Sequence, residues 1–243
     1  IMSSDWSSDV CSSDLTDEQK RFQATKMAIH AAMVDRTDRE IGRLVDQLQA
    51  MGVYEDTLIF FLSDNGCSAE IMIRAGGHDP DAPMGAEETH LCLGPGWSTH
   101  CNTPHKRHKI WVNEGGVATP LIAHWPNGIE AHGELRHDTG HVIDFLPTIL
   151  ELAGVATEDI PLAEGAPPLP GRSLVRSFTE DRSIERDYIY FNHSGNRALR
   201  MGDWKIVSGT SAAPNGSEDD AWELYDLSTD RCEMNEIGRA SCR

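Results

Sequence analysis

The segment Thr57 to Gly66, TLIFFLSDNG, constrains the fold of this 243-residue chain more than any other stretch of its sequence. Its five consecutive apolar residues, Leu58 to Leu62, fit a strand that is buried on both faces of a parallel sheet. The run ends in SDNG, so Asp64 and Asn65 stand at the carboxyl end of the strand. Ligands bind at that edge in open α/β sheets. Asp, Asn and Gly also form ordinary turns, so the ten residues alone leave both interpretations open.

A long helix is predicted immediately before this strand. Thr16, followed by two acidic residues, has the pattern of a helix N-cap with acids in the first turn. Apolar residues then recur at helical spacing from Met27 to Leu48. Gly52 stands where a left-handed helix stop belongs. A helix that leads into a buried strand is half of a βαβ repeat, which predicts the α/β fold class.

The rest of the chain divides at a Pro-rich connector, residues 156–170. Before the connector, residues 67–103 read as an irregular excursion after the strand end, where α/β enzymes build their sites. A second strand, Pro120–His124, and a helix, His141–Ala153, follow, and Pro147 is expected to bend that helix. After the connector we expect four short strands joined by turn-forming residues such as Gly202 and Asp203. Their predicted ranges are 187–191, 197–201, 204–207 and 222–227.

Both ends of the chain look foreign to this pattern. Ser3 to Leu15 repeats an SSD unit three times without helical or strand periodicity, and it resembles translated sequencing-adapter sequence. Residues 237–243 look similar in kind, and the alternative for both is a natural polar tail. The predicted organisation is therefore a tail at 1–15, a partial α/β domain at 16–170, an antiparallel subdomain at 171–236 and a second tail at 237–243.

Composition excludes several classes of protein. The formal net charge of −18 argues against nucleic acid or an anionic membrane as a general partner. No apolar run approaches membrane-spanning length. No CxxC pair occurs, which argues against a zinc ribbon. Outside the two tails the cysteines are Cys67, Cys92, Cys101 and Cys232, and the sequence leaves open whether they are free or form a disulfide.

Two groups of residues are candidates for chemistry. Asp64 and Asn65 carry oxygen ligands suited to a hard cation such as Ca²⁺ or Mg²⁺. The segment from His105 to Lys109 is the densest basic cluster in a very acidic chain, a pattern that suits an enzyme holding a small anionic group. The alternative for this cluster is a solvated basic loop. The Glu114-Gly115-Gly116 sequence that follows also fits a simple flexible turn.

These segments together resemble a known family. LSDNG, a lysine five residues before EGG, and TPLIAHWP look like the carboxyl-terminal half of the arylsulfatase-type sulfatases, in the alkaline-phosphatase-like superfamily. HAAMVDRTDREIGRLVDQL, VIDFLPTILELAG, RALRMGDWKIV and WELYDLSTD are similar to further segments of that family, in the family's order. The resemblance implies the C-terminal part of a mixed, mainly parallel sheet sandwiched by helices, followed by a small antiparallel C-terminal subdomain. Localisation stays unknown, although relatives are often periplasmic or secreted.

The resemblance also implies roles for three residues. Asp64 and Asn65 match the family's ligands to a divalent cation, usually Ca²⁺, with Mg²⁺ as the alternative. Lys109 matches the lysine that contacts the sulfate ester and stabilises its developing charge, which makes it both substrate-binding and catalytic. The implied substrate is a sulfate ester, either an aryl sulfate or a sulfated carbohydrate. The chain departs from the family at His105, which is aromatic in many relatives, and at Asn113, often a histidine, so substrate choice stays in doubt.

One family hallmark is absent from this sequence. Sulfatases use a formylglycine made from Cys or Ser in a C/S-x-P-x-R motif, and the chain contains no such motif. We therefore expect the nucleophile and the remaining metal ligands to lie in a preceding half, and the chain as given to be inactive and to bind Ca²⁺ weakly. Two alternatives remain: a phosphatase or phosphodiesterase of the same superfamily, and a non-catalytic module stabilised by a metal. Oligomeric state is unknown.

Overall fold

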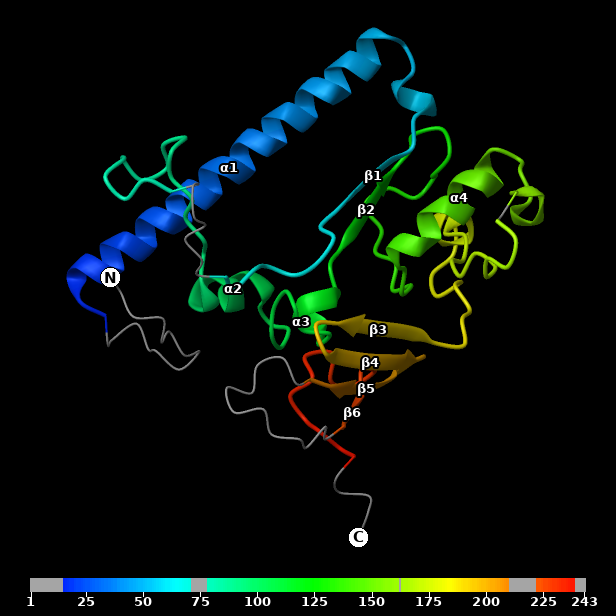
Figure 1. Ribbon diagram of the computed structural model, residues 1–243. Helices are drawn as coiled ribbons and strands as arrows, with labels where there is room; N and C mark the ends of the chain where they lie inside the picture. The colour runs from blue at the N-terminus through cyan, green and yellow to red at the C-terminus, as the bar shows by residue number, and fades with distance from the viewer. Residues whose placement is uncertain (1–14, 71–77, 162, 210–221, 239–243) are drawn as a thin grey trace. The chain divides into compact units, whose positions relative to one another are not determined.

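The computed structural model describes residues 15–70, 78–161, 163–209 and 222–238 (Figure 1). The chain forms two compact units. The first contains residues 1–46, 65–120 and 190–243, and the second contains residues 47–64 and 121–189. Most of the two predicted tails lies outside the described residues. Within the described part of the chain, no helix is both long enough and apolar enough to cross a membrane.

The long helix α1 spans Asp17–Ala50, as the sequence predicts. Thr16 and Gln19 form a reciprocal cap at its start. The Gln19 amide donates to Thr16 Oγ1 at 3.2 Å, and the Thr16 amide donates to Gln19 Oε1 at 2.8 Å. At the other end Gly52 has a φ of +69°, the left-handed conformation that stops helices and that glycine adopts without a steric penalty.

The TLIFFLSDNG segment contains β1, Ile59–Leu62, and this strand pairs with β2, Leu121–His124. The pairing is antiparallel, with Ile59 opposite His124, so the parallel neighbour expected from the apolar run is wrong for this pair. Burial on both faces is also wrong, because Phe61 is 49% exposed and Ile122 is 58% exposed. An apolar run indicates a tendency toward burial, but it carries no information about the direction of the neighbouring strand. The α/β class itself is confirmed.

The predicted helix at 141–153 begins later than expected. A 3₁₀ turn, η3 (Val142–Asp144), precedes α4, which spans Phe145–Leu152, and Gly154 ends it with a φ of +71°. Pro147 therefore lies in the first turn of α4, where its missing N–H costs no helical hydrogen bond, and the expected bend is unnecessary. The other short 3₁₀ helices are η2 (Tyr54–Asp56), η4 (Thr157–Asp159) and η5 (Val175–Phe178).

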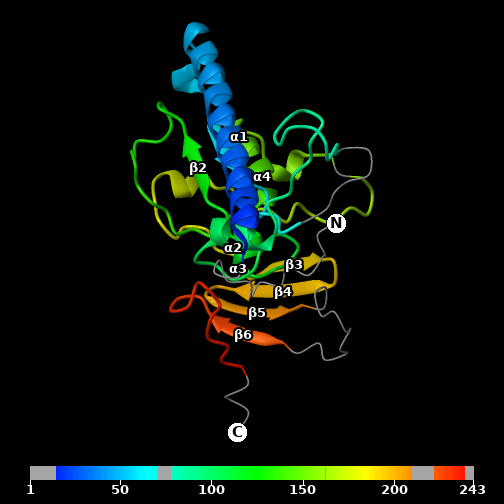
Figure 2. The same cartoon turned by 90° about the vertical axis from the view of Figure 1, so that its left-hand side faces the viewer.

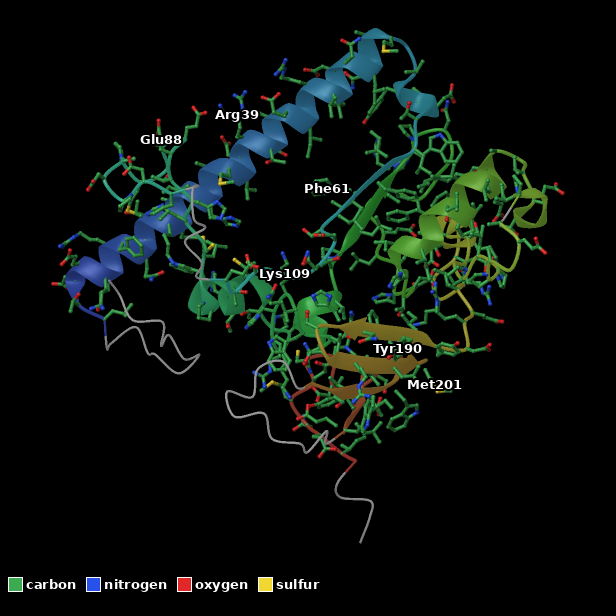
Figure 3. The ribbon with its side chains drawn as sticks, viewed as in Figure 1. Arg39, Phe61, Glu88, Lys109, Tyr190 and Met201 are labelled. Carbon is green, nitrogen blue, oxygen red and sulfur yellow. The ribbon has the colours of Figure 1, made fainter. Side chains whose placement is uncertain are left out.

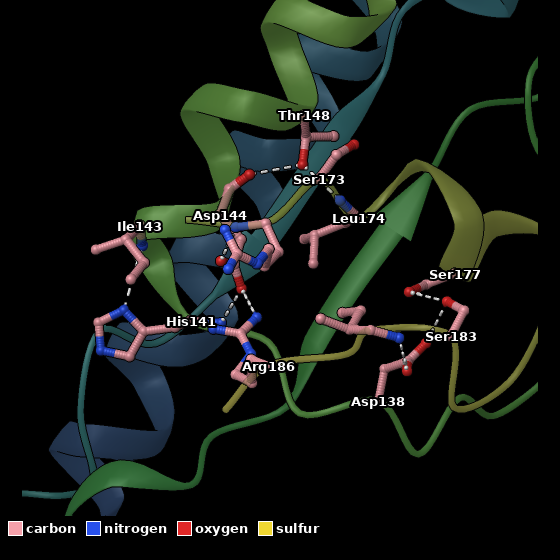
Figure 4. Close-up of polar contacts among 12 residues, drawn as sticks. Asp138, His141, Ile143, Asp144, Thr148, Ser173, Leu174, Ser177, Ser183 and Arg186 are labelled. Atoms are coloured by element: carbon pink, nitrogen blue, oxygen red, sulfur yellow. Dashed lines mark hydrogen bonds and ion pairs between the residues drawn. The ribbon is translucent and has the colours of Figure 1, made fainter. Parts of the chain in front are cut away.

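A fully buried carboxylate, Asp144, holds α4 to the segment that follows the connector (Figure 4). Arg186 Nη2 donates to Asp144 Oδ2 at 2.6 Å, and the Arg172 amide donates to Asp144 Oδ1 at 2.8 Å. One turn along α4, Thr148 Oγ1 accepts the Leu174 amide at 2.8 Å. Buried polar groups need such partners, so these contacts fix the second unit around α4.

The C-terminal sheet has the strand order β3-β4-β5-β6 (Figure 2). Its strands are β3 (Ile189–His193), β4 (Asn196–Met201), β5 (Trp204–Ser208) and β6 (Glu223–Asp226). β4 pairs antiparallel with β5, and β5 with β6, so the predicted antiparallel strands and their turn at Gly202-Asp203 are confirmed. Its buried core is small and consists of Val112, Ala198, Val207, Tyr225 and Leu227.

Candidate functional site

The candidate site lies on segments of the first unit that the sequence identified only in part. The excursion at 67–103, expected to be irregular, contains α2 at Pro95–Asn102. The Gly94-Pro95 pair is the signal that could have located it, because proline is favoured at the first helical position. The Glu114-Gly115-Gly116 sequence is a buried helical turn, α3 (Glu114–Val117), so its interpretation as a simple flexible turn is wrong.

Gly66, the last residue of SDNG, packs directly against α3. Its amide donates to the Gly116 carbonyl at 3.0 Å. A Cβ placed at Gly66 would overlap the carbonyl oxygen of Gly115. Glycine is therefore required here for close approach of two backbones, which gives a physical reason for SDNG and EGG to occur together.

The two glycines of α3 in turn lie against the basic segment. A Cβ at Gly115 would overlap the carbonyls of Lys106 and Arg107, and one at Gly116 would overlap those of His108 and Trp111. The Gly115 amide also donates to the Lys106 carbonyl at 2.9 Å. The backbone of the basic segment thus packs directly against α3.

Lys109 lies on this loop between α2 and α3 (Figure 3). Its amide donates to the Cys67 carbonyl at 3.1 Å, which attaches it to the residue after SDNG. Lys109 is half-buried as a residue, and among the described residues its ammonium group makes no ion pair, hydrogen bond or ring contact. A half-buried cation without a protein partner is able to receive an anionic group.

The neighbouring basic residues are engaged elsewhere in the first unit. Lys106 Nζ donates to Tyr225 Oη at 2.8 Å and lies 3.4 Å from Glu223 Oε2. The Arg107 guanidinium stacks over Trp111, with 4.3 Å between its Cζ and the ring centroid. Within the basic cluster, Lys106 and Arg107 therefore fasten the loop. The Lys109 ammonium does not, because it has no partner among the described residues.

His108 and Cys67 border Lys109 and have shifted pKa values. Burial lowers the pKa of His108 below its ordinary value of 6.5, and the Arg107 charge lowers it further, although a bond to the Lys109 carbonyl opposes the shift. Burial and the adjacent Cys101 thiol raise the pKa of Cys67. Both shifts favour the neutral forms of the two groups. The described cysteines Cys67, Cys92, Cys101 and Cys232 are not joined by disulfides.

Asp64 and Asn65 occupy the end of the segment after β1, with Asp64 exposed and Asn65 half-buried. The boundary between the two units falls between them. Their carboxylate and amide oxygens fit a hard cation, although such an ion takes 6–8 oxygen ligands. In the described ranges, no cluster of three or more His, Cys, Asp or Glu side chains could hold a metal. The donor chemistry fits Ca²⁺, and the donor number does not complete a site.

Sequence reasoning missed the buried polar residues under the loop. Asn196, Lys205 and Glu233 have exposed fractions of 0%. Lys205 sits in the strand sequence WKIVS, where alternation suggests a solvent-facing side chain, and nothing local signals its burial. Its carboxylate partners come from residues that are distant in sequence.

Comparison with known proteins identifies two matching family models. The Sulfatase model matches residues 5–155, well over half of the chain. A model described as N-sulphoglucosamine sulphohydrolase, C-terminal, matches residues 105–241. Together they cover both units, including β1, the basic loop, α3 and the C-terminal sheet.

Individual relatives agree with these models. An uncharacterized sulfatase of Schizosaccharomyces pombe is 29% identical, over 93% of this chain and 42% of that protein. An arylsulfatase of Klebsiella aerogenes is 30% identical, over 66% of this chain and 36% of that protein. The chain thus spans less than half the length of these curated relatives.

Solved structures show the same fold at lower identity. A protein solved in complex with its substrate D-glucosamine-2-N,6-O-disulfate has a TM-score of 0.51 and 23% identity, covering 86% of this chain and 36% of that one. A protein solved in complex with k-i-k-neocarrahexaose has a TM-score of 0.58 and 24% identity, covering 87% and 39%. These likenesses support the fold alone.

Proposed function

The chain belongs to the sulfatase family, and we propose that its Lys109 binds the sulfate group of a sulfate ester that a longer form of this protein hydrolyses. The observation that carries this proposal is the ammonium of the half-buried residue Lys109, which has no protein partner among the described residues while Lys106 nearby is paired. A sulfate ester offers oxygens that carry negative charge. An ammonium group that is already held in position binds such oxygens through charge-assisted hydrogen bonds.

The chemistry assigned to Lys109 is electrostatic. Negative charge grows on the sulfate oxygens and on the leaving oxygen as the ester bond breaks. A cationic group aimed at these atoms stabilises the transition state more than the ground state, and removal of one such donor typically lowers the rate about 10²–10³-fold. Because the loop is fixed by its contacts with α3, Lys109 pays little reorganisation cost when the charge develops.

We assign a metal-binding role to Asp64 and Asn65 in the longer protein, with Ca²⁺ as the first choice and Mg²⁺ as the alternative. Hard oxygen ligands of this kind favour those cations over zinc. A bound divalent cation would supply further positive charge beside the sulfate oxygens. Two ligands are too few for tight binding, so the chain as given should bind Ca²⁺ weakly.

The proposed substrates are sulfate esters of aryl alcohols or of carbohydrates. Named relatives include an arylsulfatase and N-acetylgalactosamine-6-sulfatases, the mouse protein being 26% identical over 82% of this chain. The departures at His105 and Asn113 lie in the same loop as Lys109, and we place the choice between these substrates there.

The nucleophile in this proposal is a formylglycine from a C/S-x-P-x-R motif outside the present sequence. The test is to determine the coding sequence upstream of residue 1 and to assay its product on an aryl sulfate. A C/S-x-P-x-R motif together with sulfate release supports the proposal. A Thr or Ser nucleophile with additional His ligands would indicate a phosphatase instead, and the absence of both would indicate a non-catalytic module.

A further inference from the structure

The loop that carries Lys109 has a strained backbone on both sides of that residue. Arg107 has a φ of +71° and Ile110 has a φ of +85°. For a β-branched residue such as isoleucine this conformation is a genuine outlier. Strained residues of this kind persist only where the surrounding structure over-determines them. The contacts that hold this loop therefore need to be identified.

Two buried or half-buried amide side chains hold the strained residues. Asn196, fully buried at the start of β4, donates from Nδ2 to the Ile110 carbonyl at 2.9 Å. Asn102, the last residue of α2, donates from Nδ2 to the Arg107 carbonyl at 3.3 Å. Each strained residue thus has its carbonyl fixed by a different element of the first unit.

Beneath α3 lies a buried group of three charged side chains. Lys205 Nζ, on β5, lies 2.7 Å from Glu114 Oε1 and 2.8 Å from Glu233 Oε1. The exposed fractions are 0% for Lys205 and Glu233 and 3% for Glu114. Glu233 Oε2 also accepts the Glu114 amide at 3.0 Å. One ammonium therefore joins the first residue of α3 to the C-terminal segment.

Such a buried ion group is a poor source of stability, because desolvation of the charges offsets most of their attraction. Its value lies in specifying geometry, since each buried charge must sit close to its partner. Glu114 is followed by the two glycines that contact the carbonyls of residues 106–111. A displacement of Glu114 would therefore displace the loop.

We propose that Lys205 is a positioning residue: by fixing Glu114 against Glu233 it holds the strained loop and places the Lys109 ammonium for its anionic ligand. The ligand part of this statement rests on the sulfate-binding role proposed for Lys109. The holding of the loop stands independently on the ion group, on Asn196 and on the backbone of α3. The C-terminal sheet thus supports the candidate site through Lys205 and Asn196.

The test compares variants of the present chain that separate positioning from charge balance. Lys205→Met leaves two buried carboxylates without their cation, so loss of folding in this variant alone does not separate positioning from charge. Lys205→Met/Glu114→Gln removes one positive and one negative charge, so it keeps the net charge that the group has in the unmodified chain and still abolishes both ion pairs of Lys205. Glu233→Gln keeps the shape of the third partner and removes its charge. Lys20→Met, in an exposed pair with Asp17, is the matched control.

Two measurements are made on every variant: amide hydrogen exchange of residues 106–116, compared with α4, and binding of inorganic sulfate. We expect the double variant and Glu233→Gln to fold, to exchange about tenfold or more faster at 106–116 with α4 unchanged, and to bind sulfate about tenfold or more weakly. The Lys20→Met control should match the unmodified chain in both measurements.

Three outcomes would overturn the proposal. In the first, the double variant shows the same amide hydrogen exchange at 106–116 and the same sulfate affinity as the unmodified chain, so Lys205 only balances charge. In the second, exchange rises equally in α4 and at 106–116. In the third, neither the double variant nor Glu233→Gln folds, so that the ion group serves folding as a whole. If the unmodified chain binds no sulfate, the proposed function fails, while exchange at 106–116 still decides whether Lys205 holds the loop.

Discussion

The backbone amide of Lys109 donates to the carbonyl oxygen of Cys67 at 3.1 Å. The same carbonyl accepts the Ser98 hydroxyl at 2.8 Å, so it is a fixed point between α2 and the basic loop. Through this bond the candidate sulfate-binding lysine is attached one residue beyond the SDNG sequence. Within the first unit, Gly66 of LSDNG is thus bonded directly to EGG, and Lys109 is bonded to the residue that follows LSDNG.

The close packing of Gly66 against α3 predicts that Gly66→Ala is strongly destabilising. The added methyl would overlap the Gly115 carbonyl, and backbone atoms cannot move aside as a flexible side chain can. Overpacking of this kind costs about 1–3 kcal/mol or more in the free energy of unfolding, measurable by urea denaturation. Gly42→Ala is the matched control, because nothing lies within 4 Å of its added Cβ.

Gly42 lies inside α1, so its replacement by alanine should stabilise the chain by up to about 1 kcal/mol. The contact between SDNG and EGG would be contradicted if Gly66→Ala unfolded at the same urea concentration as the unmodified chain.

The lowered pKa of His108 predicts a loss of stability in mild acid. Burial, the main cause, disfavours the charged imidazole in the folded state, so the folded pKa lies below the ordinary 6.5 of the unfolded chain. The resulting stability is fully present above pH 6.5 and is lost as the pH falls from there through the folded pKa. Urea denaturation at pH 7.5 and 5.5 should show a larger loss for the unmodified chain than for His108→Gln.

The pKa of His141 is also lowered by burial. Its effect on the pH dependence of stability is the same in the unmodified chain and in His108→Gln. Only the difference between them therefore reports on His108. Identical pH dependence in the two proteins would contradict the assignment.

The incomplete ligand set at Asp64 and Asn65 predicts weak binding of Ca²⁺ to the present chain. Two oxygen ligands against the 6–8 that Ca²⁺ takes should give a Kd of about 1 mM or weaker in a calorimetric titration. Asp64→Ala should remove the remaining binding, whereas Asp35→Ala, which loses an exposed pair with Arg39, should not change it. Micromolar affinity, or binding that survives Asp64→Ala, would place the cation elsewhere.

Local patterns were sufficient to predict most of the regular structure. The cap at Thr16, the stop at Gly52 and the turn at Gly202-Asp203 each depend on residues close in sequence, and each is confirmed. The β3–β4 turn also has a local signal, the Ser194-Gly195 pair. Ser194 and Gly195 both have positive φ, the pattern of a two-residue hairpin turn.

Features that depend on distant residues could not be predicted in the same way. The apolar run of β1 gave no indication that its partner β2 is antiparallel. The burial of Lys205 has no local signal in the sequence. Its partners are Glu114, 91 residues before it on α3, and Glu233, near the chain's end. For the candidate site, residue chemistry pointed to Asp64, Asn65 and the basic cluster, and family resemblance then singled out Lys109. The buried residues that hold the loop were missed.

The most direct test of the central claim is a titration of the isotope-labelled chain with inorganic sulfate, followed by nuclear magnetic resonance. The account predicts saturable shifts of the amide signals of residues 108–111, and affinity at least about tenfold weaker in Lys109→Met. Stability should change by less than about 0.5 kcal/mol, because the ammonium has no partner to lose among the described residues. Sulfate binding of equal affinity in Lys109→Met and the unmodified chain would contradict the account.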